Sequence, residues 1–403
     1  ARSSSGRRLK PDFFRDDYPV CMPIFPRTLN PLTTGVSAFL FGPRMTGKTT
    51  LLRGIPADAW FDLLDPALEL QYRANPGLFW EQLSAIREEA VIVVDEVQRA
   101  PELLNVVQMG IDRRRQVFLL SGSSARKLRR GGANLLGGRA LDLRLHPLCA
   151  DELGKDFRMD RALSFGTLPQ IATLVTEKRE DVARQLLASY VTTYLREEIQ
   201  AEALTRNVGA FARFLQIAAQ HHGQVIEFAS ISRDCAVPAS TVKEYFQILE
   251  DTLIGFLLWP FDRSERKKSR PRFYLFDCGV IRALQQRLED PPTPAETGFL
   301  FENWVVNELR RIRDYERKPH EFAFWRERDR VVDLLVTKGN RVIHAFKCKS
   351  GRTDLRPGVA GRFREIFPGV PLAVISMSDA RPRMADGVEI LPVKEALQRY
   401  RAL

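Results

Sequence analysis

Residues 41–50 read Phe41-Gly42-Pro43-Arg44-Met45-Thr46-Gly47-Lys48-Thr49-Thr50, and this stretch decides the fold of the first part of the chain. It fits the pattern G-x-x-x-x-G-K-[ST] of the phosphate-binding loop. Glycines let the backbone curl so that successive N–H groups point at a phosphate. Lys48 adds a positive charge near the β- and γ-phosphates, and the Thr49 hydroxyl can bind Mg²⁺. We predict that Gly42 through Thr50 hold a nucleotide; a plain glycine-rich turn is the alternative interpretation.

The sequence on both sides of this motif favours the phosphate loop over the plain turn. The apolar run before it suits a buried strand, and the run that starts at Thr49 suits a helix whose N-terminus faces the anion. From residue 31 to 150, strand-like runs alternate with helix-like runs, which is typical of a parallel sheet wrapped by helices. The predicted strands are Ser37–Phe41, Trp60–Leu64, Val91–Val94, Val117–Ser121 and Leu141–Leu145.

A second motif, Val91-Ile92-Val93-Val94-Asp95-Glu96, ends in two acidic residues. A continuous β-branched run suits a strand that is buried on both faces. Ligands of open α/β sheets bind at the carboxyl ends of such strands. We predict that Asp95 binds Mg²⁺ and that Glu96 polarises the attacking water as a general base. An ordinary strand that ends in an acidic turn is the alternative, and the phosphate-loop motif upstream favours catalysis.

Two further residues are candidates for the same site. Ser121 ends the next predicted strand, where a polar residue can sense the γ-phosphate, although small turn residues are also ordinary there. Arg139 follows two glycines after a loop rich in arginine. An arginine can stabilise charge in the transition state, from the same chain or across a subunit interface. We take Arg139 as the candidate for that role.

These motifs together resemble those of the bacterial and archaeal AAA-type ATPases that carry a C-terminal DUF4143 region. Met45 departs from the polar residue expected at its position, with little consequence because that position contributes only backbone. The resemblance covers about residues 30 to 400 and implies an ATPase that uses ATP and Mg²⁺. It rests on residues 42–51, Asp95-Glu96-Val97-Gln98-Arg99-Ala100-Pro101, Ser121-Gly122-Ser123-Ser124, and Gly138-Arg139 before Leu145-His146-Pro147-Leu148.

Residues 151–294 are predicted to form three segments. Apolar residues at helical spacing within 151–215 indicate a helical lid over the nucleotide domain. Residues 216–262 look like a winged helix, with helices over Phe228–Asp234 and Ser240–Leu249, the second capped by Ala239 or Ser240. Such a module reads DNA or packs against protein, and the sequence leaves both open. Residues 263–294 are predicted as a basic linker, whose run 263–270 is either solvated or bound to a phosphate backbone.

Residues 295–403 are predicted to form a second, smaller α/β domain that looks like the restriction-endonuclease core. That chemistry needs a Glu on a helix, an Asp ending one strand, and Glu-x-Lys on the next, grouped around Mg²⁺. Glu302, Asp333 and Lys349 match three positions, but Lys347 replaces the strand glutamate. We therefore expect a degenerate domain without nuclease activity. One alternative is that Lys347 points away and Asp333 works with a different acid, such as Glu327. The other is that these residues never formed a site and that Asp333 is a strand-end carboxylate paired with Lys349. The predicted strands are Phe322–Trp325, Val331–Val336, Val342–Cys348 and Leu372–Ile375.

Composition sets limits on the partners and the compartment of this 403-residue chain. The net charge of +11 permits a nucleic-acid partner without requiring one. No apolar run reaches the ~18 residues that span a membrane. Five scattered cysteines without a C-x-x-C pair favour reduced thiols and a cytoplasmic location, and the histidines show no zinc spacing. Residues 1–30 read as a basic N-terminal tail and lead-in.

The sequence therefore predicts an α/β protein with an AAA-type P-loop domain at 31–150, followed by the lid, the winged-helix-like module, the basic linker and the nuclease-like domain. Three functional classes remain open. The chain is a hydrolysing ATPase that couples nucleotide state to domain rearrangement, a nucleotide-gated switch with little turnover, or a DNA-binding regulatory or defence protein. A homo-oligomer fits all three, and the sequence does not identify a protein partner.

Overall fold

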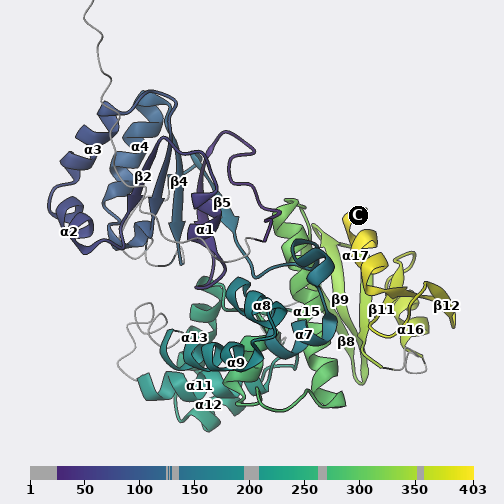
Figure 1. Cartoon of the computed structure of the whole chain (residues 1–403). Coiled ribbons are helices and arrows are strands. Elements are labelled where there is room, and N and C mark those ends of the chain that lie inside the picture. Colours follow the sequence, from purple (N-terminus) through teal and green to yellow (C-terminus); the bar gives the residue numbers. More distant parts are fainter. Residues whose placement is uncertain are drawn as a thin grey trace, which may run out of the picture.

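The computed structural model describes residues 25–123, 126, 128, 136–194, 208–261, 270–351 and 358–403. Figure 1 shows an N-terminal α/β unit, a group of helices in the middle of the chain, and a C-terminal α/β unit beside the long helix α15 (Pro294–Tyr315). Within the described residues, no helix is long and apolar enough to cross a membrane.

The N-terminal unit is a five-stranded parallel sheet in the order β2-β3-β4-β1-β5. All five predicted strands are present, with bounds that differ from the prediction by no more than a few residues. Strand β4 separates β1 from β3, so the end of β4 lies between the two predicted nucleotide motifs. The strands are β1 (Ser37–Phe41), β2 (Ala59–Asp62), β3 (Val91–Asp95), β4 (Val117–Gly122) and β5 (Ala140–Arg144).

Helices cover both faces of this sheet. Successive residues of its central strands point to opposite faces, and both sets are apolar. Phe39 and Phe41 point to the face that packs against α3 and α4, whereas Leu40 points to the face that packs against Leu52 of α1. Burial on two faces explains the unbroken β-branched run of β3. The helices of this unit are α1 (Lys48–Arg53), α2 (Pro66–Ala74), α3 (Pro76–Ala85) and α4 (Leu103–Arg114).

The middle of the chain is mostly helical and packs around one core that also includes apolar residues of α15 and of the C-terminal sheet. The predicted helices of the winged-helix-like module are present, and a hairpin of β6 and β7 follows them. The elements are α6 (Ala150–Leu153), α7 (Met159–Phe165), α8 (Pro169–Thr176), α9 (Glu180–Ser189), α11 (Val208–Gln220), α12 (Phe228–Cys235), α13 (Ala239–Asp251), β6 (Gly255–Leu258), β7 (Arg272–Leu275) and α14 (Cys278–Leu284).

Two expectations for this region are wrong. Residues 263–294 are not only a linker, because β7 pairs with β6 and α14 is buried along its whole length. The N-cap of α13 is Pro238 without a side-chain cap bond, rather than Ala239 or Ser240. The basic run itself lies outside the described residues, apart from Arg270.

The C-terminal unit is a six-stranded sheet in the order β12-β13-β11-β10-β9-β8, with α15 against it. The four predicted strands are present, and β12 and β13 extend the sheet beyond the prediction. Strands β8, β9 and β10 form an antiparallel meander, and β11 returns parallel to β10. The elements are β8 (Glu321–Glu327), β9 (Arg330–Lys338), β10 (Arg341–Lys349), α16 (Val359–Ile366), β11 (Leu372–Ser376), β12 (Arg383–Ala385), β13 (Val388–Pro392) and α17 (Val393–Arg401).

Candidate nucleotide-binding site

The predicted phosphate loop connects β1 to α1 at the carboxyl edge of the N-terminal sheet. A Cβ atom at Gly42 would collide with the carbonyl oxygen of Leu145, so only glycine fits there. Gly47 has a φ of 90°, in the left-handed region that favours glycine, and it is the N-cap of α1. The Thr46 hydroxyl donates to the Pro43 carbonyl at 2.8 Å and closes the turn from inside. These contacts give the loop a fixed, curled backbone.

Lys48 is the first residue of α1, and its side chain folds back beneath the loop. Its Nζ donates to the carbonyls of Gly42 at 2.7 Å and Pro43 at 3.3 Å, and the residue is only 6% exposed. The ammonium group is therefore held in the bend of the loop. Arg44 and Thr50 are exposed on either side of it, and Met45 has a φ of 64°.

Three predicted residues meet at the ends of α1, β3 and β4. The Thr49 hydroxyl donates to Oδ2 of Asp95 at 2.8 Å, and the Ser121 hydroxyl donates to Oδ1 of the same carboxylate. Asp95 is completely buried. A hydroxyl and a carboxylate oxygen this close fit Mg²⁺, which binds protein through one or two oxygens and takes its other ligands from phosphates and water. Thr49 and Asp95 are the residues that would hold the ion.

Glu96 directly follows β3 and begins a short helical turn. Its φ of 59° puts a non-glycine residue in the left-handed region, a conformation that costs energy and is frequent at functional sites. Its backbone N–H donates to the Ser121 hydroxyl at 3.0 Å. Ser121 thus contacts both acidic residues of the motif.

Gln98 is a site residue to which sequence reasoning gave no role. Its side-chain amide donates to Oε2 of Glu96, and its own Oε1 is buried without a hydrogen-bond partner. A Cβ atom at Gly122 would lie 2.7 Å from that Oε1, so glycine at 122 makes room for the Gln98 amide. In the sequence, Gln98 belongs to the Asp95-Glu96-Val97-Gln98 motif of the family resemblance, which gives it no role.

Arg139 does not lie with these residues. It precedes β5, and the register pairs Ala140 with Ser37, at the amino end of β1, whereas the phosphate loop starts after Phe41 at the other end. Its guanidinium donates to Asp112 of α4 at 2.7 Å. The expectation that Arg139 completes the site of its own chain is therefore wrong, because β5 carries it to the opposite edge of the sheet. A role toward a second subunit stays a prediction.

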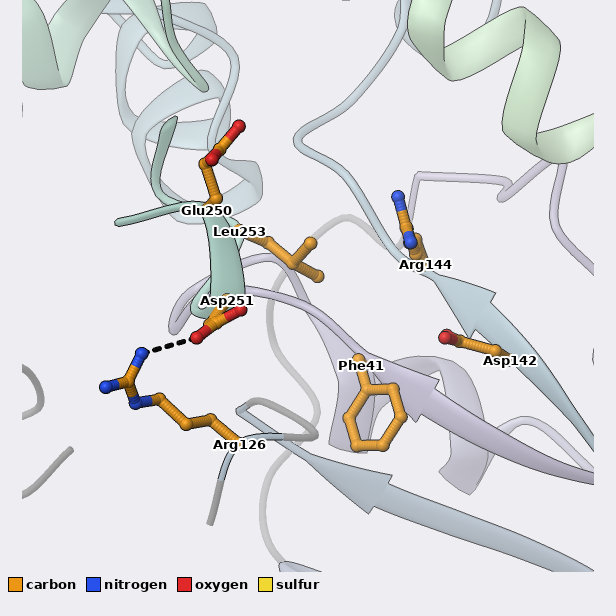
Figure 2. Close-up of a pocket in the computed structure, with 7 residues that line it drawn as sticks. All are labelled: Phe41, Arg126, Asp142, Arg144, Glu250, Asp251 and Leu253. Atoms are coloured by element: carbon orange, nitrogen blue, oxygen red, sulfur yellow. Dashed lines mark hydrogen bonds and ion pairs between the residues drawn. The ribbon is translucent and has the colours of Figure 1, made fainter. Parts of the chain in front are cut away.

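A polar cavity of about 110 Å³ opens where the sheet meets the end of α13 (Figure 2). Phe41, Asp142 and Arg144 line it from β1 and β5, and Glu250 and Asp251 line it from α13. Arg126 forms an ion pair with Asp251 across the gap. The edge of the sheet that carries the phosphate loop therefore contacts the winged-helix-like module through charged groups.

The nuclease-like residues also gather, around a cavity of about 250 Å³ in the C-terminal unit. Lys347 donates to Asp333 at 2.8 Å, and Arg272 donates to Glu302 at 2.7 Å and to Asp333 at 3.3 Å. The alternative in which Lys347 points away is therefore wrong, because Lys347 and Arg272 both bind Asp333. Glu327 instead binds Arg362 at 2.7 Å. Two cations thus neutralise the two acidic residues that a metal would need.

Burial and neighbouring charges shift the pKa values of Glu302 and Asp333 in opposite directions. Burial, together with the charge of Asp333, raises the pKa of Glu302 to about 6. Burial also opposes ionisation of Asp333, but the charges of Lys347 and Arg272 lower the pKa of that carboxyl. Among the described residues, no group of three or more His, Cys, Asp or Glu side chains could hold a metal ion.

Comparisons with known proteins agree with the motifs. An AAA domain matches residues 36–154, a domain of unknown function (DUF8612) matches 156–290, and a second one (DUF4143) matches 297–396. The chain therefore combines an AAA-type ATPase-like domain with a C-terminal DUF4143 region, which confirms the resemblance predicted from the sequence. The DUF8612 match covers in one piece the stretch that the sequence analysis divided into lid, winged-helix-like module and linker.

Curated relatives of similar length carry no assigned activity. The chain is similar to "Uncharacterized protein Rv2008c" of Mycobacterium tuberculosis and "Uncharacterized protein Mb2031c" of Mycobacterium bovis. Each is 27% identical over 372 residues, covering 89% of this chain and 80% of the relative.

Among solved structures, the chain is similar to Aeropyrum pernix ORC1 in complex with DNA, with a TM-score of 0.33 and 14% identity over 62% of this chain and 86% of that chain. It is also similar to the replication initiator DnaA bound to AMPPCP and single-stranded DNA, with a TM-score of 0.28 and 14% identity. That match covers 54% of this chain and 83% of the other.

Proposed function

We propose that this chain, which joins an AAA-type P-loop domain to a DUF4143 region, binds Mg²⁺–ATP and hydrolyses it. The observation that carries the proposal is the meeting of Lys48, Thr49, Asp95 and Ser121 at one edge of the parallel sheet. Residues from three separate stretches of sequence supply a cation, a hydroxyl and a carboxylate there. Phosphoryl transfer needs those groups for positioning and electrostatic stabilisation.

Each residue has a distinct role in this proposal. Lys48 and the N–H groups of residues 44–50 bind the phosphates. Pro43 has no N–H and contributes only to the curl of the loop. Thr49 and Asp95 hold Mg²⁺, which supplies charge neutralisation between the phosphates. Ser121 orients Asp95 and the backbone of Glu96, and Glu96 accepts the proton of the attacking water. Gln98 holds the Glu96 carboxylate in place.

Hydrolysis is expected to change the relative placement of the domains. The polar cavity between the phosphate-loop edge of the sheet and α13, with the ion pair between Arg126 and Asp251 beside it, supports this part of the proposal. Cys149, Cys235, Cys278 and Cys348 are buried and free, in keeping with a reducing cytoplasm. No nuclease activity is expected, because Lys347 and Arg272 bind Asp333 in place of a metal.

A DNA-associated role is the second candidate. A short turn joins α12 to α13, the β6–β7 hairpin follows, and the basic run 263–270 lies between those two strands. Such an arrangement suits a winged helix that contacts phosphates with its hairpin. The exposed start of α13 offers Ser240, Lys243 and Glu244, a set that favours backbone contact over base reading.

Nucleotide binding tests the proposal at its first step. Isothermal titration with a non-hydrolysable ATP analogue and Mg²⁺ should give saturable binding to the parent chain. Lys48→Ala should abolish it, because the Lys48 ammonium is held in the bend of the loop, whereas Lys155→Ala, which changes an exposed lysine after α6, should bind like the parent. Equal affinity in the parent and Lys48→Ala would refute the assigned site.

A further inference from the structure

Arg27 lies before β1, outside every motif, yet its guanidinium contacts the phosphate loop. Its Nη1 donates to the Thr46 carbonyl at 2.8 Å, and its Nε donates to Glu152 of α6 at 3.1 Å. Its Nη2 donates to the His146 carbonyl at 2.7 Å and to the Tyr315 hydroxyl of α15 at 3.2 Å. The Arg27 side chain is only 8% exposed. The planar Arg27 guanidinium thus joins the phosphate loop to residues 146–152 and to helix α15.

The direction of the Thr46 carbonyl matters for nucleotide binding. In a trans peptide the C=O and the following N–H point in opposite directions. Holding the Thr46 carbonyl toward Arg27 therefore fixes the direction of the Gly47 N–H, which is one of the amides of the phosphate loop. Gly47 itself lies beside both Arg27 and Pro169, the first residue of α8. Arg27 acts on the loop from the side away from the phosphates.

The segment after β5, residues 145–150, continues this contact onto α15. The His146 ring binds Asp314 at 2.8 Å, and the His146 N–H donates to the Tyr315 hydroxyl at 3.1 Å. Farther along, Arg311 donates to the Leu148 carbonyl at 2.9 Å, and the Ala150 N–H donates to Glu308 at 2.7 Å. The four α15 residues, 308, 311, 314 and 315, recur at helical spacing and therefore share one face.

The junction of Arg27, His146, Asp314 and Tyr315 is buried and polar. Its residues therefore cannot shift independently without losing hydrogen-bond partners. Glu152 is 4% exposed, and besides Arg27 it accepts from the N–H groups of Thr28 at 2.7 Å and Cys149 at 3.1 Å. Burial lowers the pKa of His146 to about 4, so its ring is neutral at pH 7 and donates from Nε2 to Asp314. Leaving such groups unpaired costs far more than each bond contributes.

We propose that Arg27 is a positioning residue for the phosphate loop, and that the junction of Arg27, His146, Asp314 and Tyr315 couples nucleotide binding to helix α15. In this proposal, the ATPase sheet is connected to the DUF4143 region by the motif Leu145-His146-Pro147-Leu148. This inference rests on the proposed function. Coupling between binding sites is reciprocal, so changes on α15 must alter nucleotide affinity, and nucleotide must alter α15.

Titration of the non-hydrolysable ATP analogue into full-length variants tests the inference. Arg27→Gln should weaken binding by about tenfold or more, because the Thr46 carbonyl loses its donor. Tyr315→Phe and Asp314→Asn, which lie on α15, should each weaken binding about two- to tenfold. Glu316→Gln is the matched control, since Glu316 is exposed and pairs with Arg401 outside the junction. Tyr315→Phe removes one oxygen, so it tests the inference even where Arg27→Gln does not fold.

Hydrogen–deuterium exchange of α15 provides a readout that a merely structural role would not move. Nucleotide should change the exchange of residues 308–315 in the parent chain and not in Arg27→Gln. If the parent binds the analogue while both α15 variants bind equally well and the exchange of α15 stays constant, the inference is wrong. If the parent does not bind the analogue at all, the proposed function fails first and the inference falls with it.

Discussion

Replacing Gln98 with alanine should lower kcat without weakening nucleotide binding. The Gln98 amide donates to the carboxylate of Glu96, and Gly122 leaves the space in which the amide lies. Without that donor, the Glu96 carboxylate rotates freely at the end of β3 and is aligned with the attacking water for less of the time. Gln98 acts through the Glu96 carboxylate and has no proposed role toward the phosphates, so binding of ground-state phosphates should be unaffected.

The expected size of the effect follows from the contact. A hydrogen bond to a charged group contributes about 1.5–3 kcal/mol. Glu96 and Gln98 are only partly buried, so water replaces some of the lost bond and the lower figure applies. At about 1.4 kcal/mol for each factor of ten, kcat should fall about tenfold, and at most about a hundredfold. KM for ATP should change less than about twofold.

The expected fall in kcat is measured as steady-state ATP turnover of Gln98→Ala, Gly122→Ala and Gln82→Ala. Gly122→Ala should reproduce part of the loss, because its Cβ would lie 2.7 Å from the Gln98 Oε1 and displace the amide. Gln82 binds Tyr72 away from the site and serves as the control. Equal kcat in Gln98→Ala and the parent would refute the reasoning.

Three further predictions concern the rest of the chain. Lys347→Glu should create a Mn²⁺ site beside Glu302 and Asp333, detected by electron paramagnetic resonance titration as one bound Mn²⁺ more than in the parent; an equal number in the two proteins would contradict the interpretation that the Lys347 cation replaces a metal. Thermal unfolding should show stability falling as the pH drops from about 6.5 to 4, because burial lowers the pKa of His146 and of His344 to about 4 and the unfolded chain binds those protons first. Each histidine contributes on the order of 3 kcal/mol, and the two together outweigh the opposing effect of Glu302, whose raised pKa of about 6 favours folding as the pH falls; a flat profile over that window would contradict the prediction. If the chain binds duplex DNA through its basic surface, fluorescence anisotropy should give an affinity that falls steeply with salt and depends little on sequence; no binding at ~50 mM salt removes DNA as a partner.

The parts of the site that the sequence predicted are those with a local pattern. The five strands of the N-terminal sheet are short apolar runs between helical segments, and parallel strands bring their carboxyl ends to one edge. Lys48, Thr49, Asp95 and Ser121 therefore met as expected once that sheet formed. Arg139 is the opposite case, because its neighbouring glycines suggested a site while strand direction placed it at the other edge.

The residues that sequence reasoning missed depend on contacts between distant parts of the chain. Arg27 reaches Glu152 and Tyr315, which lie 125 and 288 positions away, and no local pattern marks such partners. Gln98 acquires its role only because Gly122, on a neighbouring strand, leaves space for its amide.

ATP hydrolysis by the purified full-length chain, followed as phosphate release with Mg²⁺ and with EDTA, tests the central claim most directly. The parent should release phosphate only when Mg²⁺ is present, and Glu96→Gln should bind nucleotide as the parent does while releasing none. Glu88→Gln, an exposed glutamate near the start of β3, should match the parent. Equal phosphate release by Glu96→Gln and the parent would contradict the account.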